Sequence, residues 1–373
     1  MNEALDTSLA SRPLEAGAAP AGALRIALHE DWRALEAPWR SLEAEGNCTV
    51  FQSFDWADAW YESTRRHGLA KPLIVTVEDA DGIAWILPLC RYRRRGLSFI
   101  SFADLGVSDY AAPVMARDGR IPVHAQPSLI RSILRALPRC DLVHFQKLVD
   151  LVEGRANPLL QLPGLVAMRE SAFGISIDRP WAELARKIMQ PRLRSTIRQQ
   201  RKKIGKLGPL TLTRTRDPRE IGAAIDRLMS MRRTRVEKIG RSDMPPEWRA
   251  FYHGVATRPD RRLEVCVTTL WLGEEPIATC FGLTRGVAYH VILPTFAPDP
   301  WESYRPGMLL FDAMLEEFGP QAAFRGYFDF TIGDEPYKHR FGADAHRLME
   351  YMAPRSPKGG LAYLYWRAKA AMR

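Results

Sequence analysis

The sequence predicts an α/β (α+β) fold of two similar domains, each a mixed, mostly antiparallel sheet flanked by helices. The chain has 373 residues, which suits two domains of ~150 residues each. Hydrophobic residues make up 46% and charged residues 26%, as in ordinary globular domains. Each half runs through helices, then a central hairpin of apolar strands, then further strands and helices. This shared order indicates a duplicated fold.

The first domain is expected over residues 23–165. Residues 1–22 are rich in Ala, Gly, Pro and Ser without periodicity, which predicts a disordered leader. Apolar residues at helical spacing follow Asp31, a plausible N-cap. The elements expected in this half are a strand at 24–29, a helix at 31–46, a helix from about Asp55 with Trp56, Ala59 and Trp60 buried, a hairpin at 71–94, strands at 97–104 and 109–116, a helix at 122–137 and a strand at 141–146.

The second domain is expected over residues 166–353, and it includes a basic helix at 186–207. A further short basic helix is expected at 354–373. Pro and Gly mark the ends of helices in this half, and Gly-containing turns separate its strands. The elements expected are a helical stretch at 181–207, a strand at 210–215, helices at 218–239 and 245–257, three strands within 263–293, a helix at 306–318 and a strand at 327–331.

Several classes of protein are excluded by composition. The five cysteines are scattered and form no CxxC pair, so buried reduced thiols are expected, with no disulfide framework or thiolate zinc site. The histidines lack metal-ligand spacing, and we expect no metal. No apolar run approaches the ~18 residues of a spanning helix. The N-terminal residues lack the features of a signal peptide, which predicts a cytoplasmic protein.

The net charge of +10 is concentrated in one segment. Eighteen Lys and Arg stand against four Asp and Glu within residues 186–241. On a helix, Arg194, Arg198 and Arg201 share one face, and stacked like charges repel unless they are solvated or face an anion. The segment is therefore either a solvated face or a binding site for the phosphates of a cofactor, a sugar nucleotide or RNA.

A second stretch could bind phosphate at the start of a helix. The strand that carries Tyr289 leads through a Pro-rich loop into a helix that begins at Pro306. Helix N-termini hold phosphates through their exposed N–H groups and dipole, and Gly307 would allow close approach. Many such Pro-Gly pairs simply begin a helix.

A third stretch gathers ionisable side chains at the end of a strand. Phe328 and Phe330 should face one side of the strand and Asp329 the other. Tyr337, Lys338, His339 and Arg340 follow within a few residues. This combination suits proton transfer and anion binding, although Asp329 could also be a cap or an ion-pair partner. No P-loop, dinucleotide-binding, nucleophile-elbow or HExxH motif is present.

Five motifs in order resemble the CelD/BcsL-type acyltransferases of the GNAT (N-acetyltransferase) superfamily, which are related to the FemAB transferases. The motifs are VFQSFDWADAW, SDYAAPV, RLRSTIRQQRKKIGKLG, YRPGMLL and FDFTIGDEPYKHRFGA. In the last, YKHRFGA is similar to the (Y/F)K-x-x-FG signature of FemAB proteins. The resemblance implies two tandem GNAT-like domains with a substrate cleft between them, an acetyl-CoA or other acyl-CoA donor, and a role in cellulose, exopolysaccharide or cell-envelope synthesis.

By the same resemblance, Lys338 matches the signature lysine that contacts the substrate region in FemAB proteins, and Asp109 resembles an acidic position near that family's acceptor site. The following roles are our hypothesis from these and neighbouring residues. An amine or hydroxyl acceptor, on a small molecule or a saccharide, would attack the thioester directly. Asp109 or Asp329 would remove its proton, Tyr337 or Tyr289 would protonate the leaving thiolate, and Lys338 would neutralise developing negative charge. An Asp needs burial to act as a base near neutral pH. The donor phosphates would lie at the helix start, which comprises Arg305, Gly307, Met308 and Leu309.

Two alternatives stay open. In one, the donor is an aminoacyl-tRNA, as in FemAB proteins, and the helix at 186–206 lies on the RNA backbone. In the other, the chain is a catalytically degenerate binding protein of a polysaccharide-synthesis assembly. Its basic C-terminal stretch would then touch acidic lipid or protein. The acceptor also stays open among polysaccharide, nucleotide sugar, peptide and small amine.

Overall fold

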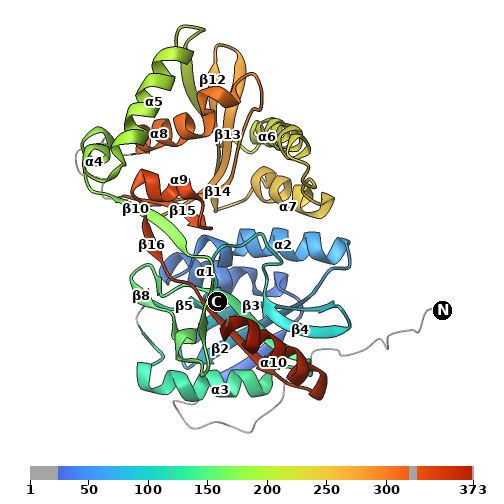
Figure 1. Cartoon of the computed structure of the whole chain (residues 1–373). Helices are drawn as coiled ribbons and strands as arrows, with labels where there is room; N and C mark the ends of the chain where they lie inside the picture. Colours follow the sequence, from blue (N-terminus) through green and yellow to red (C-terminus); the bar gives the residue numbers. More distant parts are fainter. Residues whose placement is uncertain (1–23, 118, 319–325, 372–373) are drawn as a thin grey trace, which may run out of the picture.

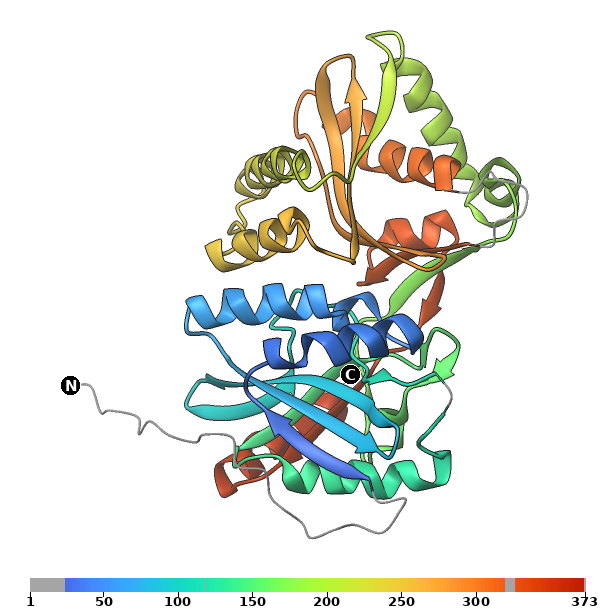
Figure 2. The same cartoon turned by 180° about the vertical axis from the view of Figure 1, so that it is seen from behind.

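The computed structural model describes residues 24–117, 119–318 and 326–371. Two mixed sheets with their helices lie one above the other, with the helices of the two domains meeting between them (Figures 1 and 2). The α/β fold with two mixed, helix-flanked sheets is confirmed. The expected leader at 1–22 lies outside the described residues.

The first sheet has the strand order β1-β2-β3-β4-β6-β17-β9, and β5 pairs with β3. All pairs are antiparallel except β4 with β6. The strands are β1 (Arg25–His29), β2 (Lys71–Asp79), β3 (Gly82–Arg94), β4 (Leu97–Phe102), β5 (Val114–Met115), β6 (Leu142–Leu148), β9 (Val166–Ala167) and β17 (Met349–Pro354). The helices are α1 (Glu36–Glu45), α2 (Phe54–Arg66), α3 (Gln126–Ala136) and α10 (Pro357–Ala371).

The second sheet has the strand order β11-β12-β13-β14-β15-β10-β16, and only β14 and β15 pair in parallel. The strands are β10 (Ala172–Ile177), β11 (Leu210–Thr215), β12 (Glu264–Leu272), β13 (Glu275–Arg285), β14 (Ala288–Phe296), β15 (Gly326–Ile332) and β16 (Asp344–His346). The helices are α4 (Trp181–Ile188), α5 (Pro191–Ile204), α6 (Ile221–Lys238), α7 (Pro246–Thr257), α8 (Pro306–Phe318) and α9 (Pro336–Phe341).

Three details differ from the expected elements. The helical stretch at 181–207 is two helices, because Pro191 starts a new helix and disfavours helical backbone at the residue before it. The strand expected at 109–116 is reduced to Val114–Met115, and Asp109 lies in a loop. The strands β9, β10, β16 and β17 and the helix α9 were not expected, so the strand at 327–331 is not the last of the chain. β17 returns from the second half of the chain to pair in the first sheet.

The two domains share one hydrophobic core where α2 packs against α7. Trp56 and Trp60 of α2 are fully buried, as their helical spacing predicted. The Trp56 ring meets Phe251 of α7 edge to face, with centroids 4.7 Å apart. Ser63 also donates a hydrogen bond of 2.7 Å to the Glu247 carbonyl. Because one cluster of buried residues contains side chains from both domains, the interface is continuous with the core.

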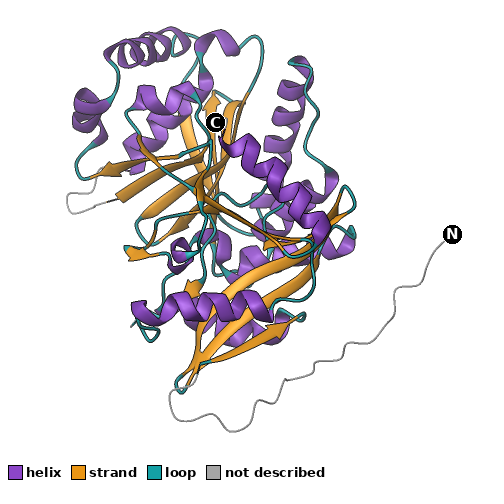
Figure 3. Ribbon diagram, turned by 60° about the horizontal axis from the view of Figure 1, so that its bottom comes forward, coloured by secondary structure: helices purple, strands orange, loops and turns teal. Residues whose placement is uncertain are grey.

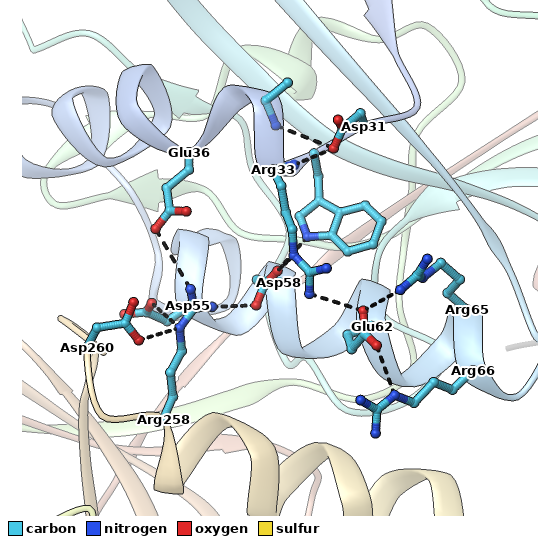
Figure 4. A network of polar contacts seen from close by, with 12 residues as sticks. Asp31, Arg33, Glu36, Asp55, Asp58, Glu62, Arg65, Arg66, Arg258 and Asp260 are labelled. Atoms are coloured by element: carbon cyan, nitrogen blue, oxygen red, sulfur yellow. Dashed lines mark hydrogen bonds and ion pairs between the residues drawn. The ribbon is translucent and has the colours of Figure 1, made fainter.

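A network of ion pairs borders this shared core (Figure 4). Asp55 is 2% exposed and accepts hydrogen bonds from Arg40, at 2.6 Å, and from the backbone N–H groups of Arg262 and Leu263, at 2.6 and 2.8 Å. Arg258 of the second domain contacts Asp58 of α2. Buried carboxylates need such partners, so Asp55 ties the domains together at low net cost.

We expect Asp55→Ala to lower the free energy of unfolding by ~3–5 kcal/mol, because it leaves buried Arg40 and two N–H groups without their acceptor. Urea denaturation measures the loss. Glu62→Ala is the matched control. Glu62 lies on the same helix as Asp55 and pairs near the protein surface with Arg33, Arg65 and Arg66, and such surface pairs contribute ~0–1 kcal/mol. Equal losses for both variants would contradict the role of Asp55.

Candidate active site

Two cavities open between the domains, one on each side of the dipeptide Asp109-Tyr110. The larger has a volume of about 1180 Å³, and its walls include Tyr110, His290 and Asp329. The smaller has a volume of about 380 Å³, and its walls include Asp109. The other residues that line the smaller cavity come from α6, α7, β14 and two loops: Gly106, Val107, Arg232, Ser242, Asp243, Met244, Pro245, Trp248, Tyr252, Ile292 and Leu293.

Hydrogen bonds within the first domain orient this dipeptide. Asp104 accepts bonds of 2.9 Å from the N–H groups of Gly106 and Ser108, which closes the loop. Lys147 donates to the Asp104 carboxylate, at 2.8 Å, and to the Ser108 carbonyl. Trp56 donates to the Ser108 hydroxyl at 2.9 Å. The loop is thus fixed on both sides, and Asp109 and Tyr110 line different cavities.

The register of β14 and β15 decides which side chains reach the larger cavity. The two strands pair over only three positions, where Tyr289 lies opposite Phe328 and His290 opposite Asp329. Because successive side chains alternate, Tyr289 stacks on Phe328 in the core of the second domain, with ring centroids 5.4 Å apart. His290 and Asp329 therefore face the other side together. The predicted alternation of Phe328 and Asp329 is confirmed.

Asp329 is the centre of a buried polar cluster. It is 1% exposed and accepts hydrogen bonds of 2.8 Å from the Tyr110 hydroxyl and 2.7 Å from the Thr331 N–H. His290 Nδ1 lies 2.8 Å from the same carboxylate. Since a carboxylate only accepts, we assign the proton to Nδ1, which leaves Nε2 as the acceptor nitrogen. Burial, reinforced by Asp329, holds the Tyr110 pKa well above its usual value.

Asp109 has the electrostatics of a base that works near neutral pH. Burial is the main cause that raises its pKa, and the charges of Asp104 and Asp329 add to it. Lys147 and the Thr331 side chain oppose the shift, and the resulting pKa is about 7. An Asp needs desolvation to serve as a base near neutral pH, and desolvation of the half-buried Asp109 raises its pKa into that range.

The other expected catalytic residues lie further from the cavities. Tyr337 stacks on Phe311, with ring centroids 5.2 Å apart, and burial raises its pKa and that of Tyr289. Lys338 is 1% exposed and donates to the carbonyls of Thr331 and Ile332, at 3.0 and 2.9 Å. It also pairs with Glu335 at 3.0 Å, so its ammonium group holds the end of β15 against α9.

The remaining residues of the YKHRFGA motif also have packing roles. Phe341 is fully buried in the core of the second domain. Gly342 ends α9 with a φ of 82°, and a Cβ there would lie 2.5 Å from the Ile188 carbonyl oxygen. Only glycine meets both conditions. The motif thus fixes the junction of β15, α9 and α4.

The expected phosphate loop is tightly packed. Arg305 has a φ of 56°, and its carbonyl accepts from the Met308 N–H at 3.0 Å. A Cβ on Gly307 would lie 3.1 Å from the Phe296 ring, so glycine lets the start of α8 approach β14. Leu309 is buried. Arg235 of α6 lies over the same Phe296 ring, 3.9 Å from its centroid.

Arg235 is a candidate anion-binding residue that the sequence analysis did not identify. Burial and the nearby Arg232 lower its pKa. Within the described part of the chain, no hydrogen bond or ion pair to Arg235 is found, although several acids pair with its neighbours. Its only signal in the sequence is the density of basic residues over 186–241. A partly buried cation without a carboxylate partner is suited to an anionic ligand.

Two of the three arginines expected to bind anions have partners inside the protein. Arg194 donates to the Ala185 and Arg186 carbonyls at the end of α4, at 3.3 and 3.0 Å. Arg201 pairs with Asp312, at 2.8 Å, and with Glu316, at 3.0 Å, on α8. Arg198 is exposed between them. An anion on this face would have to compete with two carboxylates.

Tyr110 and His290 were missed by the sequence reasoning, although each follows a residue that it selected. Alternation along β14 was the available signal: once Tyr289 is assigned to the core, His290 must face away from it. No comparable signal exists for Tyr110, because its partner Asp329 is 219 residues further along the chain.

Comparisons with known proteins agree with this architecture. Residues 191–339 match the family model described as an acetyltransferase (GNAT) domain. The structure of FemX covers 85% of this chain and 96% of its own, with 11% identity and a TM-score of 0.57. A conserved protein of unknown function from Bacteroides thetaiotaomicron covers 89% and 100%, with 14% identity and a TM-score of 0.53.

A third structure, L-PGS from Bacillus licheniformis, covers 90% of this chain and 96% of its own, with 12% identity and a TM-score of 0.52. No protein of curated function matches the sequence. The family match indicates a GNAT acyltransferase fold for residues 191–339, and these structures share the fold of most of the chain. At such low identity the likeness shows the shared fold, and the CelD/BcsL type stays a prediction from the motifs.

Two further searches concern membranes and metals. No helix within the described ranges combines the length and the apolar character needed to cross a bilayer. Among the same residues, no group of three or more His, Cys, Asp and Glu side chains is arranged to hold a metal ion.

The raised pKa of Asp109 makes a prediction for stability. The folded state holds the Asp109 proton more tightly than the unfolded chain does, so ionisation lowers stability as pH rises from about 4 through about 7. We expect Asp109→Asn to be more stable than wild type at pH 8, by roughly 1–3 kcal/mol, with a smaller difference at pH 5. Thermal unfolding at both pH values measures this.

Asp104→Asn is the contrasting variant, because Asp104 accepts bonds from Lys147 and from two N–H groups. It should destabilise the protein at both pH values. A destabilisation of Asp109→Asn that is the same at pH 5 and pH 8 would show that Asp109 is not held with a raised pKa.

Proposed function

We propose that this protein transfers an acyl group from an acyl-CoA thioester directly to an amine or hydroxyl group of an acceptor held between its domains. One observation carries the proposal: Asp109, with a pKa of about 7, faces a cavity where the first domain meets β14 of the GNAT domain. A general base with a pKa near the working pH is what direct acyl transfer requires.

The Asp109 carboxyl group alone can accept and return the proton that the reaction moves. The acceptor N–H or O–H loses its proton to Asp109 as its nitrogen or oxygen forms a bond to the thioester carbonyl carbon. The C–S bond then breaks, and the CoA thiolate leaves. The proton on Asp109 returns to that thiolate, whose ordinary pKa of ~8.5 makes it a good leaving group. Tyr289 and Tyr337, the acids expected from the sequence, pack in the core of the second domain.

The donor phosphates would lie at the start of α8. The Gly307 N–H and the helix dipole favour negative charge there, while the Met308 N–H already donates to the Arg305 carbonyl. Arg235, which lies over Phe296 beside Gly307, would supply a cation without breaking an ion pair. Arg305, at the same helix start, would supply another.

The larger cavity would hold the body of the acceptor. Its volume of about 1180 Å³ exceeds the ~300–1,000 Å³ of ordinary ligand pockets, which suits an extended molecule. Arginines and carboxylates both line it, so its walls offer donors and acceptors for a polar, saccharide-like substrate. The CelD/BcsL resemblance supports an acceptor from cellulose or other exopolysaccharide synthesis. The His290–Asp329 pair would bind a hydroxyl group of this body, while the reacting hydroxyl or amine would lie at Asp109 in the smaller cavity.

Calorimetric titration with acetyl-CoA at near-physiological salt tests the donor, with ATP as the control for a generic polyphosphate site. We expect saturable binding that is stronger than that of ATP. Arg235→Ala should weaken it by ~10-fold, while Arg198→Ala, on the exposed face of α5, should not change it. No heat with acetyl-CoA or longer acyl-CoAs would refute the acyl-CoA donor.

Release of free CoA thiol in the presence of candidate saccharide and amine acceptors tests the base. Asp109→Asn should lower kcat by ~10²–10⁴-fold while acetyl-CoA binding is retained. Wild-type kcat/KM should rise with pH and level off above about 7, because only ionised Asp109 accepts a proton. The residual activity of Asp109→Asn should lack this inflection, and an unchanged pH profile would remove Asp109 from the mechanism.

A second candidate donor, aminoacyl-tRNA, is favoured by one observation. The helix α5 contains no Asp or Glu, and the helix with the turn that follows it exposes several cations: Arg192, Arg198, Lys202, Lys203 and Lys206. Such a row fits a phosphate backbone. If six phosphates are contacted, tRNA affinity should fall by ~10³-fold or more between roughly 50 and 200 mM salt. If acyl-CoA gives no binding heat and tRNA binds with this salt dependence, aminoacyl-tRNA replaces acyl-CoA as the proposed donor.

A further inference from the structure

The C-terminal helix α10 packs by one side only. Its start is fixed where Ser356 contacts the Asp141 carboxylate and the Gly359 N–H donates to the Ser356 hydroxyl at 3.1 Å. A Cβ on Gly359 would lie 1.9 Å from the Asp141 carbonyl oxygen, so glycine is needed for this close approach. Further along, Trp366 donates to Glu350 of β17 at 3.3 Å. The helix is therefore a folded part of the first domain.

The opposite side of α10 exposes large apolar residues. Leu361, Leu364 and Tyr365 are 74%, 65% and 73% exposed, and they stand at i, i+3 and i+4, which places them together on one face. In Figures 1 and 3, α10 lies across the outside of the first domain and no other helix or strand lies over it. Contiguous exposed apolar residues of this kind mark an interaction surface.

The charges around this face identify its partner. Residues 351–373 contain no Asp or Glu. Lys358 precedes Leu361 by three positions, Arg367 follows Leu364 by three, and Lys369 follows Tyr365 by four, so each exposed cation neighbours an exposed apolar side chain. A two-fold pairing of this face with a second copy would bring like charges together. An anionic surface satisfies the cations and the apolar residues at once.

We propose that α10 is an interfacial helix that docks the protein on an anionic membrane surface. Leucine and tyrosine side chains enter the boundary between lipid headgroups and acyl chains, and flanking Lys and Arg pair with lipid phosphates. The helix lies in the plane of the surface and does not span the bilayer. This surface is separate from both cavities, and the proposal does not rest on the acyl-transfer proposal.

Co-sedimentation of the full chain with lipid vesicles tests the docking. Vesicles of phosphatidylcholine and phosphatidylglycerol in equal parts should carry the protein down, and vesicles of phosphatidylcholine alone should not. The double variant Leu361→Glu/Leu364→Glu should weaken binding by ~10-fold or more, as should Lys358→Gln/Arg367→Gln/Lys369→Gln. Binding should also weaken in ~1 M salt, which screens the charges.

The matched control is Val123→Glu/Leu207→Glu, which introduces the same charges at residues that are 72% and 57% exposed elsewhere. It should bind like wild type apart from a small electrostatic loss. Equal weakening by the control and the α10 variant would show only general charge attraction and would overturn the proposal. So would failure of wild type to bind anionic vesicles, or a wild-type dimer that Leu361→Glu/Leu364→Glu converts to a monomer.

Discussion

The packing of α2 against the second domain is the contact on which the candidate site depends. Trp56 lies at its centre: its ring meets Phe251 of α7, and its indole N–H binds Ser108. Ser108 belongs to the loop that carries Asp109 and Tyr110. The same side chain therefore joins the two domains and sets the position of the loop between the two cavities. The site exists only while the shared core is intact.

Two aspartates of the first domain, Asp55 and Asp109, have different roles because their surroundings differ. Asp55 is buried against Arg40 and two backbone N–H groups, so its charge is matched and it serves the interface. Asp109 is half-buried near Asp104 and Asp329, and Lys147, whose charge lowers its pKa, is already bound to Asp104. Desolvation, with the like charges of Asp104 and Asp329, raises the pKa of Asp109 to about 7 and makes it able to exchange a proton.

Local patterns predicted what depends on local physics. Helical spacing placed Trp56 and Trp60 in the core, and strand alternation separated Phe328 from Asp329. The break of the basic helix at Pro191 was not predicted, although the proline itself was the signal for it. By contrast, the contact of Tyr110 with Asp329 and the position of Arg235 over Phe296 arise from tertiary packing. No periodicity in a single sequence encodes them.

The Lys338 of the FemAB-like motif acts on the candidate site through backbone geometry. Its ammonium group holds the Thr331 and Ile332 carbonyls, while Thr331 has a φ of 58°, a conformation that a β-branched residue adopts only when its surroundings impose it. In that conformation Thr331 donates its hydroxyl to the Val291 carbonyl and its N–H to Asp329. The lysine thus helps to hold the end of β15 in the conformation that places the Thr331 N–H on Asp329, so the motif stabilises the buried polar cluster without contacting the cavity.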